Sequence, residues 1–352
     1  MDPAALKHNL SRVRELAPGC RVLAVIKANA YGHGSVIAAE ALAAADGFAV
    51  ARLEEAVRLR DAGCRARIVL LEGVQDAAEL ELAAAHELEP FVHMPVQVAL
   101  LEDWAGAHLF RVWLKIDSGM GRLGFRPADA RAVAARLGAC RCLAAPPNLA
   151  THLSEAEKPG SAETGAQIER FARATAGLPG ETSIGNSAGL IGWPGARSGW
   201  VRPGIMLYGI SPFPDRTGAD LGLRPAMTFE TRVIAVKDLA PGDRVGYGGN
   251  WTAAQPSRIA VAAAGYGDGY PRSTASGAPV WVNGQPARLA GQVSMDMMTI
   301  DVSGLPDVAP GDRVELWGES VPVERVAAAA GTIAYELTCR VSRRVPFHLR
   351  GS

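Results

Sequence analysis

The chain has 352 residues, 48% of them hydrophobic, which is enough for one large domain and a smaller one. Lys plus Arg number 36 and Asp plus Glu also number 36, so composition provides neither a basic field for nucleic acid nor a polybasic face for a membrane. Five scattered cysteines argue against a disulfide framework, and their spacing fits no zinc site. No apolar run approaches the roughly 18 residues of a transmembrane helix, so we expect a cytoplasmic protein.

From residue 20 to about 208, short apolar segments alternate with amphipathic ones. Helical spacing of apolar residues occurs at 53–63, 76–88 and 127–139. The predicted strands are 22–27, 47–52, 67–72, 88–93, 109–117, 147–152, 182–186 and 201–208. This alternation predicts right-handed parallel crossovers, and eight units suit a closed (β/α)8 TIM-type barrel. The pattern alone also fits an open doubly wound sheet.

After Pro225 the sequence becomes strand-like, with turn signals such as Asn283-Gly284 between the strands. The phrases LAPGDRVGYG (239–248) and VAPGDRVELWG (308–318) repeat a tight turn that leads into a strand. We therefore predict two domains, a β/α barrel over 1–228 and a mostly β domain over 229–352.

Polar side chains recur where the predicted barrel strands end, and in barrel enzymes this end carries the chemistry. In chain order they are Lys27, Lys115 with Asp117 and Arg122, Thr151-His152, Asn186-Ser187 and Arg202. We interpret Asp117 as a structural acceptor for the SGMG turn that follows it. The convergence of these residues predicts a site.

The residue types at these strand ends favour one kind of chemistry. A strand-end lysine can form a Schiff base if its surroundings keep it neutral. Ser187, Gly204 and the backbone around Ile205 match the place where barrels bind phosphate. There is no acidic pair for a metal ion, and GYGDGYPR (265–272) is a weak dinucleotide signal because Pro271 and a β context follow it.

Nine ordered motifs resemble one known family along nearly the whole chain. They are AVIKANAYGHG (24–34), LKIDSGMGRLGF (114–125), THLSEAE (151–157), GNSAG (185–189), VRPGIMLYG (201–209), VGYGG (245–249), GYGDGYPR (265–272), VSMDMM (293–298) and AYELTCRVSRRVP (334–346). The chain resembles the alanine racemases, pyridoxal-phosphate isomerases with a β/α barrel and a C-terminal β domain. The resemblance implies interconversion of L- and D-alanine through an aldimine with two-base proton transfer, and D-alanine supply for cell-wall peptidoglycan.

The resemblance also assigns residues to the cofactor. Lys27 would be the aldimine lysine, and Arg202 would face the pyridine nitrogen with His152 supporting it. Because arginine has donors and no acceptor, that nitrogen would be unprotonated. The residues implied around the cofactor, mainly its phosphate, are Tyr31, Asn186, Ser187, Gly204, Ile205 and Tyr335.

For proton transfer, the resemblance implies a homodimer with shared sites. Lys27 would serve one face of Cα, and Tyr247 from the second subunit would serve the other. A tyrosine base needs a pKa lowered by roughly two to three units, about 3–4 kcal/mol, and we expect cationic Arg202 and His152 to provide this.

The resemblance also implies substrate contacts. Arg122 would bind the cofactor phenolate and the substrate carboxylate, and Lys115 would be carbamylated to face it as an anion. Met295, Asp296 and Tyr266 would come from the partner subunit, with Tyr266 narrowing the entrance.

Three alternatives were weighed against this interpretation. A pyridoxal-phosphate decarboxylase of the same barrel class would place an acidic residue at the pyridine nitrogen, where Arg202 stands. A single-domain pyridoxal-phosphate-binding protein would lack residues 229–352. A racemase for serine or a broader range of amino acids stays open, because pocket shape decides selectivity. Members of the family usually have a further strand before the position where this sequence starts, MDPAALKHNL, so either the start is trimmed or the strand is missing. A missing strand predicts an exposed edge on the β domain.

Overall fold

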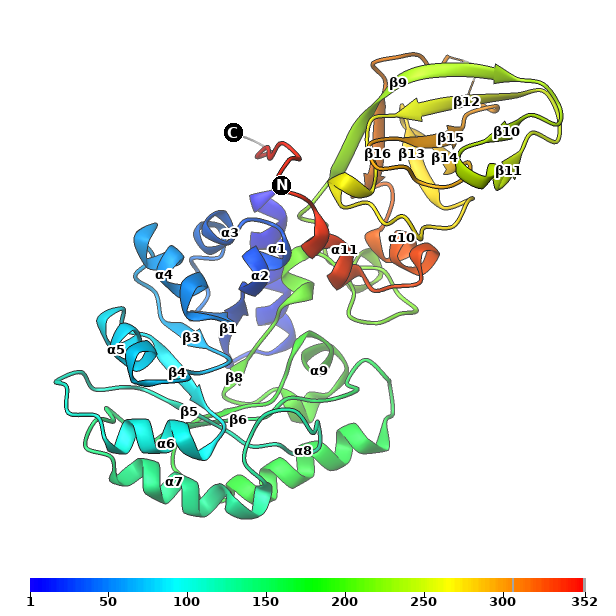
Figure 1. Cartoon of the computed structure of the whole chain (residues 1–352). Helices are drawn as coiled ribbons and strands as arrows, with labels where there is room; N and C mark the ends of the chain where they lie inside the picture. The colour runs from blue at the N-terminus through cyan, green and yellow to red at the C-terminus, as the bar shows by residue number, and fades with distance from the viewer. Residues whose placement is uncertain (306, 351–352) are drawn as a thin grey trace. The chain divides into compact units, whose positions relative to one another are not determined.

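The computed structural model describes residues 1–305 and 307–350, which divide into two compact units (Figure 1). We call residues Leu6–Ala30 and Gly34–Leu207 the barrel unit. We call the remaining described residues, 1–5, 31–33 and those from 208 onward, the β unit. Each unit is described by itself.

The barrel unit contains eight parallel strands that close on themselves, since β1 pairs with both β2 and β8. The strands are β1 (Arg21–Val25), β2 (Gly47–Val50), β3 (Ile68–Leu70), β4 (Glu89–Val92), β5 (Trp113–Lys115), β6 (Asn148–Ala150), β7 (Thr182–Ser183) and β8 (Trp200–Val201). They follow one another around the barrel in chain order. The predicted closed barrel is confirmed, and the open sheet is wrong.

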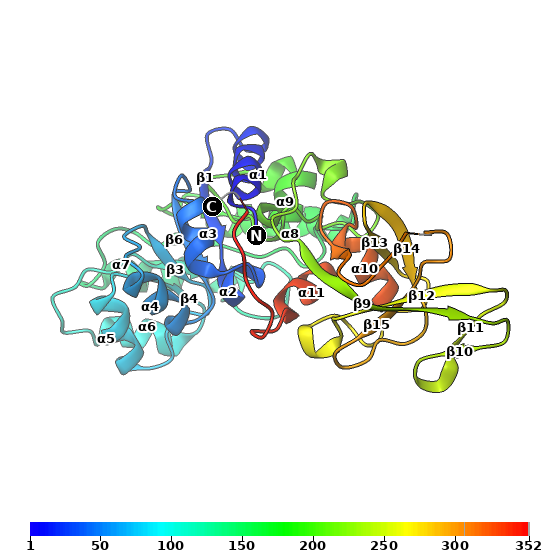
Figure 2. The same cartoon turned by 90° about the horizontal axis from the view of Figure 1, so that it is seen from above.

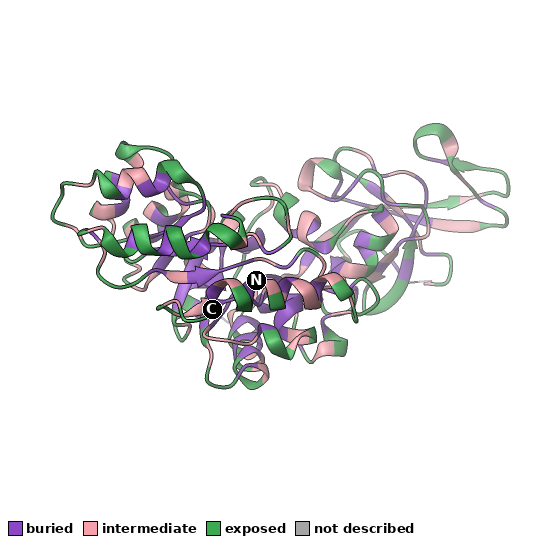
Figure 3. Cartoon of the chain, turned by 90° about the horizontal axis from the view of Figure 1, so that it is seen from below, coloured by how far each residue is buried: buried purple, intermediate pink, exposed green. Residues whose placement is uncertain are grey.

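Helices follow most of these strands and surround them (Figures 1 and 2). They are α1 (Pro3–Leu16), α3 (Ser35–Ala41), α4 (Leu53–Asp61), α5 (Ala77–Ala85), α6 (Pro95–Glu102), α7 (Ala130–Ala139), α8 (Ala162–Thr175) and α9 (Ser187–Gly192). Side-chain caps begin three of them, since Asp76 accepts from the backbone N–H of Glu79, Ser161 from that of Thr164 and Asn186 from that of Gly189. Their buried residues face the strands, as the purple segments of Figure 3 show.

The eighth strand is shorter than predicted. Strand β8 ends at Val201, and a 3-10 turn, η3 (Ile205–Tyr208), follows where the sequence predicted continued strand. Pro203 cannot donate a backbone hydrogen bond, although its carbonyl still accepts from Val25 at 2.9 Å. Arg202 and Gly204 therefore lie at the strand end instead of inside a strand.

At the amino ends of the strands, aromatic and charged side chains fill the barrel. Trp113 and Trp200 pack edge to face at 5.6 Å between ring centroids. The buried Glu89 accepts from the indole N–H of Trp113 at 3.0 Å and pairs with Arg67 at 2.8 Å. Burial raises the pKa of Glu89, and Arg67 opposes that shift. The carboxyl ends of the strands are therefore where a ligand can enter.

The β unit contains a second closed barrel, of six strands in the order β12-β15-β14-β13-β16-β9. They are β9 (Phe229–Leu239), β12 (Ser257–Ala262), β13 (Pro279–Val282), β14 (Gln285–Leu289), β15 (Met298–Asp301) and β16 (Arg313–Trp317). Positive φ at Asn283 and Gly284 makes the predicted tight turn between β13 and β14. The predicted mostly β domain is confirmed. The prediction of an exposed strand edge is wrong for this barrel, because its six strands form a closed ring.

Other elements of the β unit complete it. A hairpin of β10 (Arg244–Val245) and β11 (Trp251–Thr252) carries the short turn η5 (Tyr247–Gly249). Two helices, α10 (Val323–Ala330) and α11 (Ala334–Arg340), lie near the C-terminal end of the chain. Within residues 1–305 and 307–350, no helix has both the length and the apolar composition needed to cross a membrane.

Candidate active site

The predicted barrel residues follow the carboxyl ends of their strands. Lys27 lies two residues beyond β1, Lys115 ends β5, His152 follows β6 and Arg202 follows β8 directly. The charges of Lys27, Lys115 and Arg202 all act on the pKa of His152. The barrel therefore brings together side chains from residues 27 to 202.

Lys27 begins an unusual turn. The element α2 (Lys27–Tyr31) has positive φ at four consecutive residues that are not glycine, with values of 52°, 54°, 56° and 53° from Ala28 to Tyr31. A left-handed conformation costs such residues roughly 1–2 kcal/mol each, so surrounding contacts must hold this turn. The lysine side chain is half-buried at this position.

Arg202 is a buried cation with several acceptors. Its guanidinium donates to the hydroxyl of Ser183 and to the carbonyl oxygens of Thr151, at 2.5 Å, and Ile184, at 3.3 Å. Burial lowers the pKa of Arg202 to about 10, so the group stays charged at neutral pH. Ser183 was not predicted from the sequence, because a serine within a strand gives no signal of its own.

His152 is neutral. Its Nδ1 atom lies 3.5 Å from Nη2 of Arg202, so this nitrogen can only accept from the guanidinium. Burial, followed by the positive charges of Arg202 and Lys115, lowers the pKa of His152 well below its ordinary value. The expectation of a cationic His152 is therefore wrong, and Arg202 is the remaining cation of that pair.

Lys115 is a buried amine among cations. Only 8% of the residue is exposed, and its ammonium lies 6.0 Å from the centre of the Phe91 ring. Burial, followed by the charges of Arg202 and Arg122, lowers the pKa of Lys115 to about 8. A measurable fraction of this amine is therefore neutral and nucleophilic near neutral pH.

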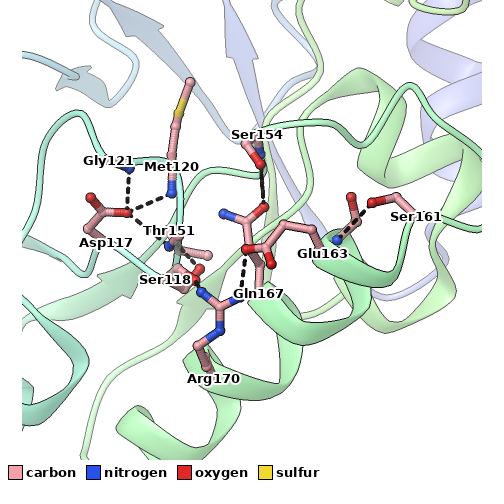
Figure 4. A network of polar contacts seen from close by, with 12 residues as sticks. Asp117, Ser118, Met120, Gly121, Thr151, Ser154, Ser161, Glu163, Gln167 and Arg170 are labelled. Carbon is pink, nitrogen blue, oxygen red and sulfur yellow. Dashed lines mark hydrogen bonds and ion pairs between the residues drawn. The ribbon is translucent and has the colours of Figure 1, made fainter.

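Arg122 is carried by a closed loop that begins at Asp117 (Figure 4). One oxygen of the Asp117 carboxylate accepts backbone N–H groups from Gly119, Met120 and Gly121 at 2.8–3.1 Å. The loop closes at Phe125, whose backbone N–H donates to the carbonyl of Lys115 at 2.9 Å. The predicted structural role of Asp117 is confirmed.

Helix α8 holds this loop from the side (Figure 4). Arg170 donates to the carbonyl oxygen of Ser118 and pairs with Glu163 at 2.5 Å. The hydroxyl of Ser118 also lies 2.8 Å from that of Thr151, one residue before His152. The sequence did not indicate Arg170, since an arginine on the polar face of a predicted helix gives no signal that it contacts a loop elsewhere in the chain.

Ser187 connects the segment after β7 to the segment after β8 by hydrogen bonds. Its hydroxyl oxygen accepts the backbone N–H of Gly204 at 2.9 Å and that of Met206 at 3.4 Å. Asn186 caps α9 by accepting from Gly189 at 2.8 Å. Ser187 and Ile205 are both buried, and the bond from Gly204 to Ser187 brings the two segments with predicted phosphate contacts side by side.

Two further predicted cofactor residues pack together in the β unit. The ring of Tyr31 lies 6.1 Å from that of Tyr335, on α11, and 4.9 Å from that of Tyr208. Burial raises the pKa of the Tyr31 phenol, so this hydroxyl stays protonated and able to donate. A side chain at Gly32 would meet the carbonyl oxygen of Thr338 at 2.0 Å, which explains the glycine beside Tyr31.

The remaining predicted residues are exposed on the β unit. Tyr247 is 69% exposed, Met295 54% and Tyr266 40%. The carboxylate of Asp296 pairs with Arg344 at 2.8 Å. These side chains do not belong to the unit that holds Lys27.

Comparisons with known proteins agree along the chain. The model of the alanine racemase N-terminal domain matches residues 1–212, and that of the C-terminal domain matches residues 226–349. An alanine racemase of an Azoarcus species is 52% identical over 352 residues, which is all of this chain and 98% of that protein. One from Nitrosococcus oceani is 49% identical over 98% of this chain and 97% of that protein.

Solved structures are similar as well. The biosynthetic alanine racemase of Pseudomonas aeruginosa has a TM-score of 0.95 at 43% identity, over 99% of this chain and 98% of that one. The Bartonella henselae alanine racemase, described with covalently bound pyridoxal phosphate, has a TM-score of 0.88 at 28% identity, over 99% of this chain and 98% of that one.

Proposed function

The chain belongs to the alanine racemase family and interconverts L- and D-alanine, and on this premise we propose that it uses pyridoxal 5′-phosphate bound at the carboxyl ends of the barrel strands. The side chains found there fit this group. Lys27 offers a primary amine, and the Ser187 hydroxyl, whose oxygen accepts the N–H of Gly204, can still donate its own proton to a phosphate. Gly204 and Ile205 are the proposed backbone neighbours of that phosphate. The other proposed cofactor contacts are Tyr31, Asn186 and Tyr335.

When bound, pyridoxal phosphate withdraws electrons from Cα of the amino acid and so acidifies its Cα–H bond. Arg202 limits this withdrawal. Because its guanidinium donates to four acceptors and stays charged, a pyridine nitrogen held next to it would accept a hydrogen bond and stay unprotonated. The fixed, buried Arg202 is the observation that carries the proposal.

We assign proton transfer to two residues on opposite faces of the substrate. The amine of Lys27 holds or takes the proton on one face, and the phenol of Tyr247 does so on the other. Of the pair Arg202 and His152, only Arg202 brings a positive charge to the site, since the pKa of His152 is lowered well below its ordinary value.

Tyr247 supports a homodimer with shared sites. Its side chain is 69% exposed and belongs to a different unit from Lys27. Tyr266, Met295 and Asp296 are exposed on the same unit, so a second copy of the chain is proposed to supply all four to the barrel site.

Lys115 is proposed to be carbamylated and to orient Arg122 toward the substrate carboxylate. Carbamate formation needs a neutral amine, and the pKa of about 8 provides one near neutral pH. The product would be an anion among Arg202, Arg122 and Lys27, which removes the repulsion that the ammonium feels.

A reducing compartment, the cytoplasm, is the proposed location. No disulfide joins any two of the five cysteines, and this is typical of proteins kept in a reducing environment.

A racemisation assay over a panel of L-amino acids, run in deuterium oxide, tests the function and its substrate range together. We expect deuterium at Cα of both alanine enantiomers and a much smaller kcat/KM for L-serine. A preference for serine would move the assignment to a serine racemase. Release of carbon dioxide would indicate a decarboxylase, which Arg202 and the comparisons do not favour.

A further inference from the structure

The turn that carries Lys27 is strained, and its far half is held by local bonds. The backbone N–H of Ala30 donates to the carbonyl of Ile26 at 2.8 Å. The side-chain oxygen of Asn29 accepts from Ser35 at 3.0 Å, and its carbonyl accepts from Gly34 at 2.9 Å. These bonds fix the end of the turn that leads into α3.

The near half of the turn is held by a residue from another part of the chain. The backbone N–H of Ala28, next to Lys27, donates to Oε1 of Glu55 at 2.6 Å. The other oxygen of this carboxylate accepts backbone N–H groups of Ala51 at 2.8 Å and Arg52 at 3.2 Å. One carboxylate therefore ties the turn after β1 to the loop after β2.

A helix-capping role explains two of these three bonds. Glu55 is the third residue of α4, and a glutamate there commonly accepts from the residue before the helix. The bonds of Oε2 are of this kind. The bond from Ala28 crosses to a different strand end and meets the first residue of the turn with positive φ.

We propose that Glu55 is a positioning residue for Lys27. Its charge-assisted bond holds Ala28 in the left-handed conformation, and that conformation directs the lysine side chain from the strand end into the site. The inference rests on the proposed role of Lys27. A glutamine at position 55 would keep one acceptor oxygen but turn its amide donors toward a backbone N–H, so both sets of bonds could not persist.

Two variants one residue apart provide the test. Glu55→Gln and Glu54→Gln each remove one charge from the first turn of α4, but Glu54 is exposed. In the holoenzyme, we expect Glu55→Gln to speed hydrogen exchange of the amides of residues 28–31 by about tenfold. We also expect a loss of kcat of about tenfold with little change in KM, because the amine is misdirected while substrate contacts stay. Glu54→Gln should match the wild type in both.

Rescue distinguishes positioning from general stability. Glycine adopts positive φ without strain, so Ala28→Gly added to Glu55→Gln should recover part of the lost kcat. If Glu55→Gln does not fold, the pair Glu55→Asp and Glu54→Asp takes its place, since Asp keeps the charge but is one methylene shorter.

Equal behaviour of the position 54 and 55 variants would overturn the inference. Faster exchange with unchanged kcat would also overturn it, leaving Glu55 a structural residue. The exchange measurement does not depend on racemisation. A failure of the proposed function would appear separately, as a wild-type enzyme without racemase activity.

Discussion

The carboxyl end of the barrel and the loops of the β unit both carry side chains assigned to the active site, but these side chains differ in burial. At the barrel end, Arg202 and Lys115 are buried, and Arg202 is fixed by several hydrogen bonds. On the β unit, Tyr247 and Met295 are more than half exposed. The barrel unit thus fixes Arg202 through its own hydrogen bonds, whereas the β unit presents Tyr247 and Met295 to solvent.

This difference indicates that the two units contribute to the site in different ways. Buried, fixed cations set the electrostatics at the barrel end, where low dielectric strengthens them. The exposed groups of the β unit are proposed to contact a substrate that is bound in the barrel of a second copy of the chain. The predictions below test each side of this comparison.

The largest effect is expected at the barrel end. Lys27→Ala should lower racemisation at least about 10⁴-fold, because it removes both the cofactor's attachment and one proton carrier. The Lys27→Ala variant, purified in the presence of pyridoxal phosphate, should also lack the visible absorbance maximum of the wild type. Lys7→Ala, at an exposed lysine of α1, serves as the control. An unchanged spectrum for Lys27→Ala would refute the assignment of Lys27.

The next effect is expected on the β unit. Tyr247→Phe should lower racemisation by about 10³-fold, since a general base and acid is lost from one face only. Deuterium exchange at Cα should therefore fall much more for one alanine enantiomer than for the other. An equal loss for both enantiomers would remove Tyr247 as a face-specific base.

Mixing the two inactive variants tests whether the sides belong to different subunits. Random exchange of Lys27→Ala with Tyr247→Phe subunits places both changes in one site of each hybrid dimer and leaves the other site intact. About a quarter of wild-type activity should return, since half of the dimers are hybrids with one working site. If the mixture shows no more racemase activity than the two variants show separately, shared sites would be contradicted.

A smaller effect is expected at Lys115. In buffer with ¹³C-labelled bicarbonate, the wild type should show a carbamate carbon signal by NMR that Lys115→Met lacks. Because the anion that orients Arg122 is lost, kcat/KM should fall by about tenfold or more. Lys237→Met, at an exposed lysine of β9, should keep both signal and activity. A carbamate signal that survives in Lys115→Met would place the modification elsewhere.

The smallest effect concerns His152 and pH. Its pKa is lowered in the folded state, so below about pH 6.5 the unfolded chain binds a proton that the folded one does not. Stability supplied by the neutral ring is therefore lost as pH falls, by up to about 1.4 kcal/mol per pH unit. Urea unfolding at pH 6.5 and 5.5 should show a smaller loss for His152→Gln than for the wild type. His348→Gln, at an exposed site, should follow the wild type.

Much of the fold could be predicted because local patterns agree with it. Apolar segments that alternate with segments of helical periodicity predict parallel crossovers, and eight of them close a barrel. The prediction of strand at 202–208 was wrong because Pro203 lacks a backbone N–H and Gly204 follows it, so strand pairing ends at Val201. The apolar residues that follow had suggested a longer strand.

The sequence by itself determined which residues follow the strand ends, because strand order around a parallel barrel follows chain order. It thereby placed Lys27, Lys115, His152 and Arg202 in one site, and nine ordered motifs indicated the family. Only the tertiary structure decided the charge of His152, since that charge depends on burial and on cations from three other strands. It also decided that Glu55 contacts Ala28, because a single short hydrogen bond between two loops depends on how those loops pack and leaves no periodicity in the chain.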